Sequence, residues 1–487
     1  MWEWLTTSPA GPVFNFLASG LLFLLANLSV ILGFICAAVI LRRIAAEKRS
    51  PSNTFAWLLL VLFIPILGVP LYFMFGGRKS RKLARIKAEV SQAAEQIAQR
   101  SSRNDQVSKD VFTPEGSPIC TKGNHCEVLP DGAATFERLC REIEAAEHTI
   151  HIATYILGDD RSGRTISDLL AARAASGVRV RLLLDSLGSW NCTRRARRKI
   201  REAGGQVAMF IPVLPLQSQI SSNLRNHRKI AIFDNFRAIT GGQNLDDRFL
   251  GNWPDPARFA DFSVVTQGPA VAELTRTFIA DWSFATRERP DQHRDLLRYI
   301  PEEAGNSTVE IIPSGPDMAT DPLWEQLIRL VQEFKQELTL VTPYFIPDEV
   351  LLQSLIVKAH TGRRIRIILP LRSNQALADI ARFRPLERLH QAGVTILFYK
   401  PGMLHGKLVI ADGLVALTGS ANIDMRSLFV NFEIALAHYT QRDVQALAEW
   451  TQTIEAQCLH YTEAMQQANI RPSKLKQDLV HLIEPLL

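Results

Sequence analysis

"HRKIAIFDNFRAITGGQNLDDR", residues 227–248, decides the fold because the chain contains it twice. It aligns without a gap with "HGKLVIADGLVALTGSANIDMR", residues 405–426, and both copies fit H-x-K-x4-D-x5-T-G-x2-N-x-D-x-R. A lone H-x-K-x4-D spacing arises easily by chance, whereas the eight fixed positions of this longer pattern, repeated in a gapless alignment of 22 residues, do not. The repeat therefore predicts a duplicated domain.

Weaker repeats flank the two motifs. The stretches 135–157 and 323–346 each predict a helix that leads into a strand, and two further pairs of strands follow a glycine. Alternation of helix and strand patterns is typical of an α/β protein. We predict two duplicated α/β domains, 111–300 and 301–487, with mixed sheets flanked by helices and an active site on a pseudo-twofold axis.

The ionisable residues of the motifs are His227, Lys229 and Asp234 in the first copy and His405, Lys407 and Asp412 in the second. Alternate side chains of a strand share a face. If the motif begins a strand, the histidine and the lysine of each copy point the same way, and the aspartate points the other way near the strand end. We expect the histidines and lysines to carry the chemistry, and the aspartates a structural or supporting role as much as a catalytic one.

Two such pairs, brought together, suit the transfer of a phosphate group. Two lysines can neutralise its non-bridging oxygens, and Asn244 and Asn422, each 17 residues after its histidine, can donate further hydrogen bonds. One imidazole can attack phosphorus while the other protonates the leaving oxygen and then deprotonates the acceptor hydroxyl. The motifs contain no carboxylate cluster of the metal-binding type, so we expect neither a metal nor another cofactor to be required.

Each imidazole also needs a partner on its second nitrogen. Glu433, 7 residues past Arg426, is the candidate for His405, and Asp261, 13 residues past Arg248, is the candidate for His227. The difference in spacing indicates an insertion of about six residues in the first copy. We therefore predict that each half of the chain orients its own histidine.

The six cysteines are too sparse for a disulfide framework. "CTKGNHC", residues 120–126, has the residue types of a metal site, but no second cluster of ligands accompanies it. We interpret this stretch as a loop.

The first 77 residues contain two long uncharged stretches. They predict membrane segments at about 13–41 and 54–76, the second of which is either a full span or a re-entrant hairpin bent at Pro65 and Pro70. A basic helical linker is expected at 78–110. Basic residues flank both segments, and the larger cluster, at 78–87, favours a cytoplasmic catalytic body.

The net charge of +6 is concentrated beside these apolar segments. Residues 42–53 carry four basic and one acidic side chain and residues 78–107 carry eight and three, which leaves the rest of the chain at −2. This pattern suits an anionic membrane surface better than a nucleic-acid groove. We expect membrane lipid, not nucleic acid, as the partner; the sequence does not indicate an oligomeric state.

The duplicated motif resembles that of the phospholipase D superfamily. The N-terminal segments, the basic linker and "NIDMRSLFVNFE" (422–433) resemble the bacterial cardiolipin synthases within it. This resemblance implies a multi-pass protein of the bacterial inner membrane that converts two phosphatidylglycerol molecules to cardiolipin and glycerol, with His227 as nucleophile and His405 as general acid and base. One departure is Gly242, which lacks the hydroxyl that Ser420 could offer to a phosphate in the second copy.

Two alternatives remain open at this stage. One is a hydrolase of the same superfamily that uses water as the acceptor. The other is a non-catalytic lipid-binding scaffold in the membrane, although such a protein would not need two intact motifs.

Overall fold

The computed structural model describes residues 51–64, 68, 81–99, 120–190, 194–211, 224–467 and 472–481, together with scattered residues between 16 and 42. The chain forms two compact units, Met1–Arg78 and Lys79–Leu487. In the first unit, helix α3 spans Pro51–Phe63. Most of the predicted segment 13–41, and much of 54–76, lie outside the described residues. No helix among the residues described combines the length and the apolar character needed to cross a bilayer.

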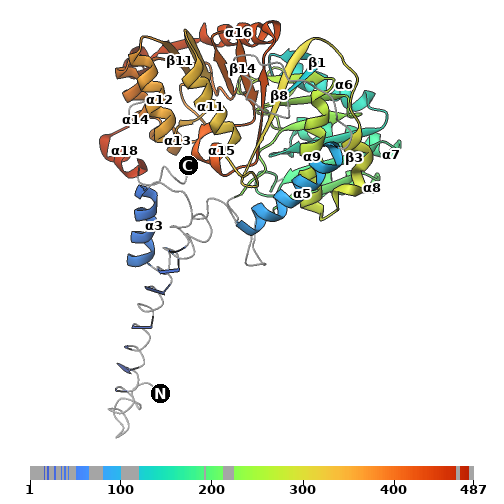
Figure 1. Ribbon diagram of the computed structural model, residues 1–487, viewed down its shortest axis with the longest axis horizontal. Coiled ribbons are helices and arrows are strands. Elements are labelled where there is room, and N and C mark those ends of the chain that lie inside the picture. The colour runs from blue at the N-terminus through green and yellow to red at the C-terminus, as the bar shows by residue number, and fades with distance from the viewer. Residues whose placement is uncertain are drawn as a thin grey trace. The chain divides into compact units, whose positions relative to one another are not determined.

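One mixed sheet of 15 strands runs through the second unit (Figure 1). The strands of its first half, from the centre outward, are β1 (Cys120–Leu129), β7 (Ser263–Gln267), β6 (Arg237–Gly241), β5 (Ile230–Phe233), β2 (Thr149–Thr154), β3 (Arg179–Asp185) and β4 (Gln206–Phe210). Those of its second half are β8 (Ser307–Ser314), β16 (Glu433–His438), β14 (Val415–Gly419), β13 (Leu408–Ala411), β9 (Glu337–Val341), β11 (Arg364–Pro370), β12 (Thr395–Tyr399) and β17 (Cys458–His460).

The two halves repeat the same order of strands. In each, the four central pairings are antiparallel and the next two are parallel, and only β17 lacks a counterpart among the strands described. Antiparallel pairing of β1 with β8 joins the halves at the centre. This arrangement confirms the predicted duplicated α/β fold, with the two copies joined edge to edge in one sheet.

Helices cover both faces of the sheet, so most strands are buried and consist largely of β-branched and aliphatic residues. Those of the first half are α6 (Gly132–Ala145), α7 (Arg161–Ala175), α8 (Arg194–Glu202), α9 (Ala270–Thr286) and α10 (Arg294–Arg298), with a 3-10 turn at Pro290–His293. Those of the second are α11 (Pro322–Glu333), α12 (Glu349–His360), α13 (Ala376–Ala381), α14 (Phe383–Gln391), α15 (Met425–Phe429), α16 (Gln441–Glu455), α17 (Tyr461–Gln467) and α18 (Lys474–His481). A short parallel pair, β10 (Phe345–Ile346) and β15 (Ile423–Asp424), lies beside the second motif.

The predicted linker is helical, but it is not a free connection. Helix α5 (Arg81–Gln99) packs against α9 and belongs to the second unit (Figure 1). Lys87, which the sequence groups with surface cations, is only 1% exposed. Its side chain forms ion pairs with Asp281 and Asp317 inside the body.

Candidate active site

The two histidines lie just ahead of strands and not within them. Strand β5 begins at Ile230 and β13 at Leu408, so each histidine and lysine belongs to an extended segment before its strand. Each segment is joined by backbone hydrogen bonds to the other half of the chain. His227 N–H donates to Phe432 O at 2.9 Å, and His405 N–H donates to Ala260 O at 2.7 Å. These bonds bring both motifs to the junction of the halves.

The same contacts decide which carboxylate meets which histidine. His227 Nδ1 lies 3.0 and 3.1 Å from the two carboxylate oxygens of Glu433, and His405 Nδ1 lies 2.8 Å from Asp261 Oδ2. The predicted pairing within each half is therefore wrong, and the pairs are crossed. The physical reason is that Glu433 and Asp261 follow Phe432 and Ala260, whose carbonyl groups bind the motif of the opposite half.

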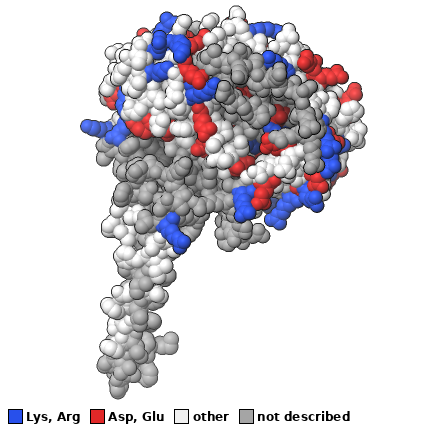
Figure 2. Space-filling view, in the orientation of Figure 1, with Lys and Arg blue, Asp and Glu red and all other residues white. Residues whose placement is uncertain are grey.

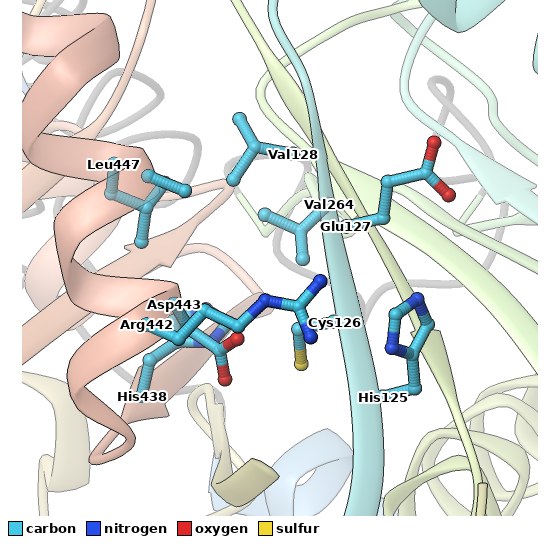
Figure 3. A pocket seen from close by; sticks show the side chains of 10 residues that line it. His125, Cys126, Glu127, Val128, Val264, His438, Arg442, Asp443 and Leu447 are labelled. Atoms are coloured by element: carbon cyan, nitrogen blue, oxygen red, sulfur yellow. The ribbon is translucent and has the colours of Figure 1, made fainter. Parts of the chain in front are cut away.

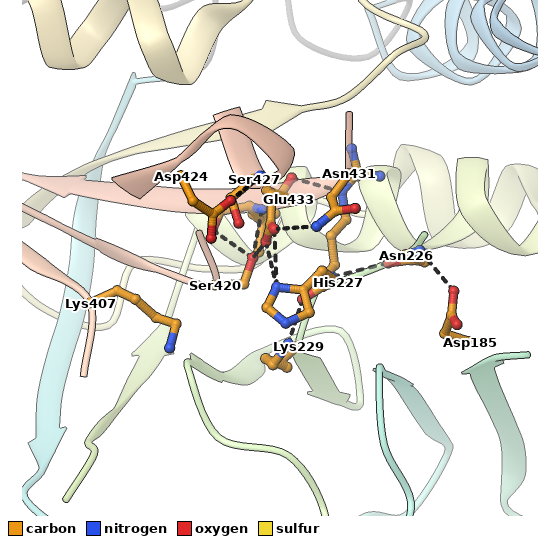
Figure 4. Close-up of polar contacts among 12 residues, drawn as sticks. Asp185, Asn226, His227, Lys229, Lys407, Ser420, Asp424, Ser427, Asn431 and Glu433 are labelled. Carbon is orange, nitrogen blue, oxygen red and sulfur yellow. Dashed lines mark hydrogen bonds and ion pairs between the residues drawn. The ribbon is translucent and has the colours of Figure 1, made fainter. Parts of the chain in front are cut away.

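His227 is held as a neutral base. Burial, more than any nearby charge, lowers the pKa of its imidazole. Although burial opposes it, contact with His227 and Lys229 keeps the pKa of Glu433 below its ordinary value, so the carboxylate is ionised. An ionised carboxylate at Nδ1 keeps the ring proton there, and the lone pair on Nε2 is left for a substrate. Figure 4 shows Glu433 on one side of the His227 ring.

His405 has a different environment. Its ring is buried against the aromatic rings of Phe249 and Phe259. Burial, with Lys407 Nζ 2.8 Å from Nδ1, holds its pKa well below the ordinary range. Burial also raises the pKa of its partner Asp261 to about 6. The two half-sites thus have the same arrangement of imidazole and carboxylate. They differ in that the pKa of Glu433 is lowered and that of Asp261 is raised.

Both motif lysines are buried beside the histidines. Lys229 Nζ donates to His227 O at 2.8 Å, and Lys407 Nζ donates to His405 O (Figure 4 labels both lysines). Burial lowers the pKa of Lys229 to about 7 and that of Lys407 to about 8. Each is therefore a cation that desolvation destabilises and that an anionic phosphate would stabilise.

One cavity, of about 230 Å³, joins the half-sites. Both histidines line it, as do the predicted phosphate contacts Asn244 and Asn422. Its other polar walls come from residues that sequence reasoning did not select: Tyr155, Arg225, Arg248, Tyr344, Asn374, Gln375, Asp424, Arg426, Ser427 and Asn431. A signal was present for Arg248 and Arg426, which occupy identical places in the two copies of the motif. Three arginines beside two imidazoles make this cavity suitable for an anionic substrate.

Ser420, the third predicted phosphate contact, is not among the residues that line this cavity. Its hydroxyl is fully buried and donates to Glu433 Oε2, so it supports the carboxylate that orients His227 and is not placed to bind phosphate. At the equivalent position, a Cβ added to Gly242 would lie 2.6 Å from Asp261 Oδ2. The departure from the pattern at Gly242 thus makes room for the second orienting carboxylate.

The two aspartates of the motifs are outside the site, which corrects their assignment as candidate catalytic residues. Each has a positive φ in the turn at the far end of its strand, 50° for Asp234 and 53° for Asp412. The Asp234 carboxylate accepts three backbone N–H groups, from residues 147–149, and that of Asp412 accepts three, from residues 335–337. Their role is to tie each β-turn to the start of the neighbouring strand.

We expect Asp412→Ala to destabilise the fold by about 1–3 kcal/mol, because three N–H donors lose a charged acceptor. Although partial burial opposes it, these donors hold the pKa of Asp412 below its ordinary value. The contribution is therefore complete above an unfolded-state pKa of about 4 and is lost as the pH falls through the lower folded value. Urea unfolding of wild type and variant as a function of pH measures this. A difference in stability that persisted unchanged at the lowest pH would contradict the assignment.

"CTKGNHC" is part of strand β1, so its interpretation as a loop is wrong. Cys126 lies beside His438 and Asp443, and these buried groups could offer three ligand atoms within 4.8 Å of one another (Figure 3). Burial raises the pKa of the thiol to about 12 and lowers that of the imidazole to about 4, so both are neutral near pH 7. Arg442 lines the same hollow, and its guanidinium opposes the binding of a divalent cation there. This cluster is distinct from the cavity of the two motifs.

A duplicated α/β sheet with two imidazoles on one cavity, each backed by a carboxylate and followed by a lysine, is the arrangement typical of phospholipase D-like enzymes. The family model described as "Cardiolipin synthase, PLD-like domain" matches residues 139–282 and 327–455. The chain belongs to this family, which confirms the resemblance in the motifs. A second model, "Phospholipase_D-nuclease N-terminal", matches residues 31–77.

Cardiolipin synthases of other bacteria align with nearly the whole of this chain. The major cardiolipin synthase of Bacillus subtilis is 31% identical over 95% of this chain and 99% of its own. The cardiolipin synthase of Geobacillus kaustophilus is 32% identical over 91% of each chain. Among solved structures, a phosphatidylserine synthase of Haemophilus influenzae has a TM-score of 0.58 at 16% identity and covers 81% of this chain and 100% of its own. That structure supports the fold alone.

Proposed function

We propose that this protein is a phosphatidyltransferase that makes cardiolipin and glycerol from two molecules of phosphatidylglycerol. The observation that carries the proposal is that two imidazoles line one cavity together with three arginines. Each imidazole is held by a buried carboxylate from the other half of the chain. The cardiolipin synthases among its relatives support the choice of lipid.

In the first step, His227 Nε2 attacks phosphorus and the bond from phosphorus to the glycerol oxygen breaks. The negative charge of the bound phosphate favours the protonated form of His405, which gives its proton to the departing oxygen, so that glycerol leaves neutral. The products are a phosphatidyl group on His227 and free glycerol. The ionised Glu433 stabilises the positive charge that develops on the attacking ring.

In the second step, the neutral His405 removes the proton from a free hydroxyl of the second phosphatidylglycerol. The new alkoxide attacks phosphorus, the bond from phosphorus to nitrogen breaks, and His227 returns to its initial state. Throughout, the two lysines offer positive charge to the non-bridging oxygens. Over the two steps, the proton that His405 gives to glycerol is replaced by the proton that it takes from the second hydroxyl, so the scheme balances.

The lowered pKa values of the two lysines predict how kcat/KM decreases at alkaline pH. A lysine is charged only below its pKa, so kcat/KM for the free enzyme is expected to fall as the pH rises through about 7, where Lys229 titrates, and about 8, where Lys407 does. Arginine stays charged throughout, so Lys229→Arg should move the start of the decline to the pKa of Lys407. Steady-state kinetics across this range test the prediction. A value of kcat/KM that stayed constant up to about pH 9 would contradict it.

We further propose that residues 1–77 hold the enzyme on the bacterial cell membrane, with two apolar segments and the catalytic body on the cytoplasmic side. The uncharged stretches and the basic residues beside them support this placement. On the face of the body drawn in Figure 2, acidic and basic side chains are interspersed. The excess of basic side chains lies beside the apolar segments, in residues 42–53 and 78–107.

The experiment that tests the proposal supplies the purified full-length protein with labelled phosphatidylglycerol in detergent micelles. Cardiolipin and glycerol in equal amounts are the expected products. Phosphatidic acid with glycerol, and no cardiolipin, would instead identify a hydrolase that uses water as the acceptor. No turnover at all would favour the scaffold and contradict the enzyme.

A further inference from the structure

A buried ion network connects helix α5 to the interior of the body. Lys87 Nζ on this helix lies 3.0 Å from Asp281 Oδ1 and 3.6 Å from Asp317 Oδ2. The three side chains are 1%, 0% and 3% exposed, so these contacts are made almost entirely without water. A charged lysine is rarely buried to this extent unless its partners need it there.

Asp281 also accepts hydrogen bonds from residues next to His227 in the first motif. Arg228 Nη1 donates to its two carboxylate oxygens at 2.7 and 2.8 Å, and Asn226 Nδ2 donates to Oδ2 at 3.1 Å. Although burial opposes it, Arg228 and Lys87 keep the pKa of Asp281 below its ordinary value. The carboxylate is thus an ionised bridge between α5 and the residues on both sides of His227.

Arg228 also donates hydrogen bonds to backbone carbonyl groups of the second half of the chain. Arg228 Nε donates to Glu433 O at 2.9 Å, and Nη2 donates to Ser314 O at 3.0 Å. Its guanidinium therefore fixes the backbone of the residue whose carboxylate orients His227. We call Lys87, Asp281, Asp317 and Arg228 the α5 network.

The second half-site has no equivalent among the residues described. Gly406 takes the place of Arg228 in the second motif. A Cβ added there would lie 2.6 Å from the indole of Trp450, a residue of α16 that packs on Phe262. Apolar packing supports the segment of His405, whereas charged contacts that begin on α5 support the segment of His227. The asymmetry indicates that α5 acts on one half-site only.

We propose that Lys87 is a positioning residue, and that the docking of α5 sets the geometry of His227 and Glu433 through Asp281 and Arg228. The inference rests on the proposed function for its kinetic consequence, but the structural coupling can be measured without any substrate.

The test uses full-length protein with Lys87→Met, which keeps the length of the side chain and removes its charge. We expect kcat for cardiolipin formation to fall by about 10- to 100-fold with little change in KM, because a small displacement of a reacting group is costly in rate. Arg85→Met is the matched control on the same helix, since Arg85 is 82% exposed and pairs only with Glu89 among the residues described. We expect it to remain within about twofold of wild type.

A second variant separates positioning from stability. Lys87→Met with Asp317→Asn removes one charge of each sign, so it should recover thermal stability but not kcat, because the contact from α5 to Asp281 is still missing. Recovery of kcat together with stability would overturn the proposal. So would a Lys87→Met protein whose kcat per folded molecule equals that of wild type.

Hydrogen–deuterium exchange gives the readout that does not depend on the substrate. The N–H groups of His227 and Phe432 cross-link the two halves, so Lys87→Met should speed their exchange, while Arg85→Met should not. Unchanged exchange in Lys87→Met would overturn the coupling. If wild type made no cardiolipin yet exchange still changed as expected, the proposed function would fail and the coupling would stand.

Discussion

Replacing His227 with alanine is expected to lower the rate of cardiolipin formation by at least about 10³-fold, and His405→Ala is expected to have an effect of similar size. Without His227 there is no atom to form the covalent intermediate. Without His405 the leaving glycerol receives no proton and the second hydroxyl loses none. Rates of product formation from labelled phosphatidylglycerol measure both effects. His360→Ala, on the exposed surface of α12, is the control and should keep full activity.

A substrate with a good leaving group separates the two roles. Phosphatidyl-p-nitrophenol releases an anion that needs no proton, so His405→Ala should still release about one equivalent of p-nitrophenol in a burst and then stop. His227→Ala should give no burst. A burst in His227→Ala with none in His405→Ala would exchange the roles of the two histidines, and turnover near the wild-type rate in either variant would contradict the mechanism.

The second large effect on the rate is expected from replacing the carboxylates that orient the histidines, Glu433 and Asp261. Glu433→Gln keeps the shape of the side chain but no longer stabilises the charge on the His227 ring, and we expect a loss of about 10²- to 10⁴-fold in kcat. Asp261→Asn should affect proton transfer by His405 instead. With phosphatidyl-p-nitrophenol, Glu433→Gln should therefore slow the burst strongly, while Asp261→Asn should leave it nearly unchanged.

The opposite pattern would show that each half of the chain orients its own histidine, contrary to the geometry described. Asp412→Asn serves as the matched control, because it makes the same kind of substitution at a carboxylate outside the cavity. Its burst should match that of wild type within about twofold.

Much of this molecule could be predicted from its sequence, because the signals involved are local or repeated. The motif at 227–248 and its copy at 405–426 predict the duplication, the α/β class and the paired histidines. The position of Asp234 before a turn residue indicated a supporting role, and the three backbone donors explain it. The apolar runs locate strands β5 and β13 inside the motifs, although the histidine and lysine of each motif lie just ahead of the strand.

The crossing of Glu433 and Asp261 could not be predicted in this way. It depends on the backbone bonds of His227 with Phe432 and of His405 with Ala260, and contacts between residues so far apart in the chain have no local pattern. The burial of Lys87 was missed for a related reason. Its partners, Asp281 and Asp317, are remote in sequence, so the sequence places it only in the basic cluster at 78–87. The interpretation of 120–126 as a loop rested on the lack of a second cluster of ligands, whereas its strand structure depends on pairing with β7, which is remote in sequence.

The measurement that tests the central claim most directly is the location of the covalent intermediate. Full-length His405→Ala protein is mixed with phosphatidyl-p-nitrophenol labelled in its phosphate, quenched at alkaline pH and cut into peptides. We predict that the label is found on one histidine only, in the peptide that contains His227, and that it is absent when His227 is also replaced. Label on any other residue, or a burst with no labelled peptide, would contradict the account.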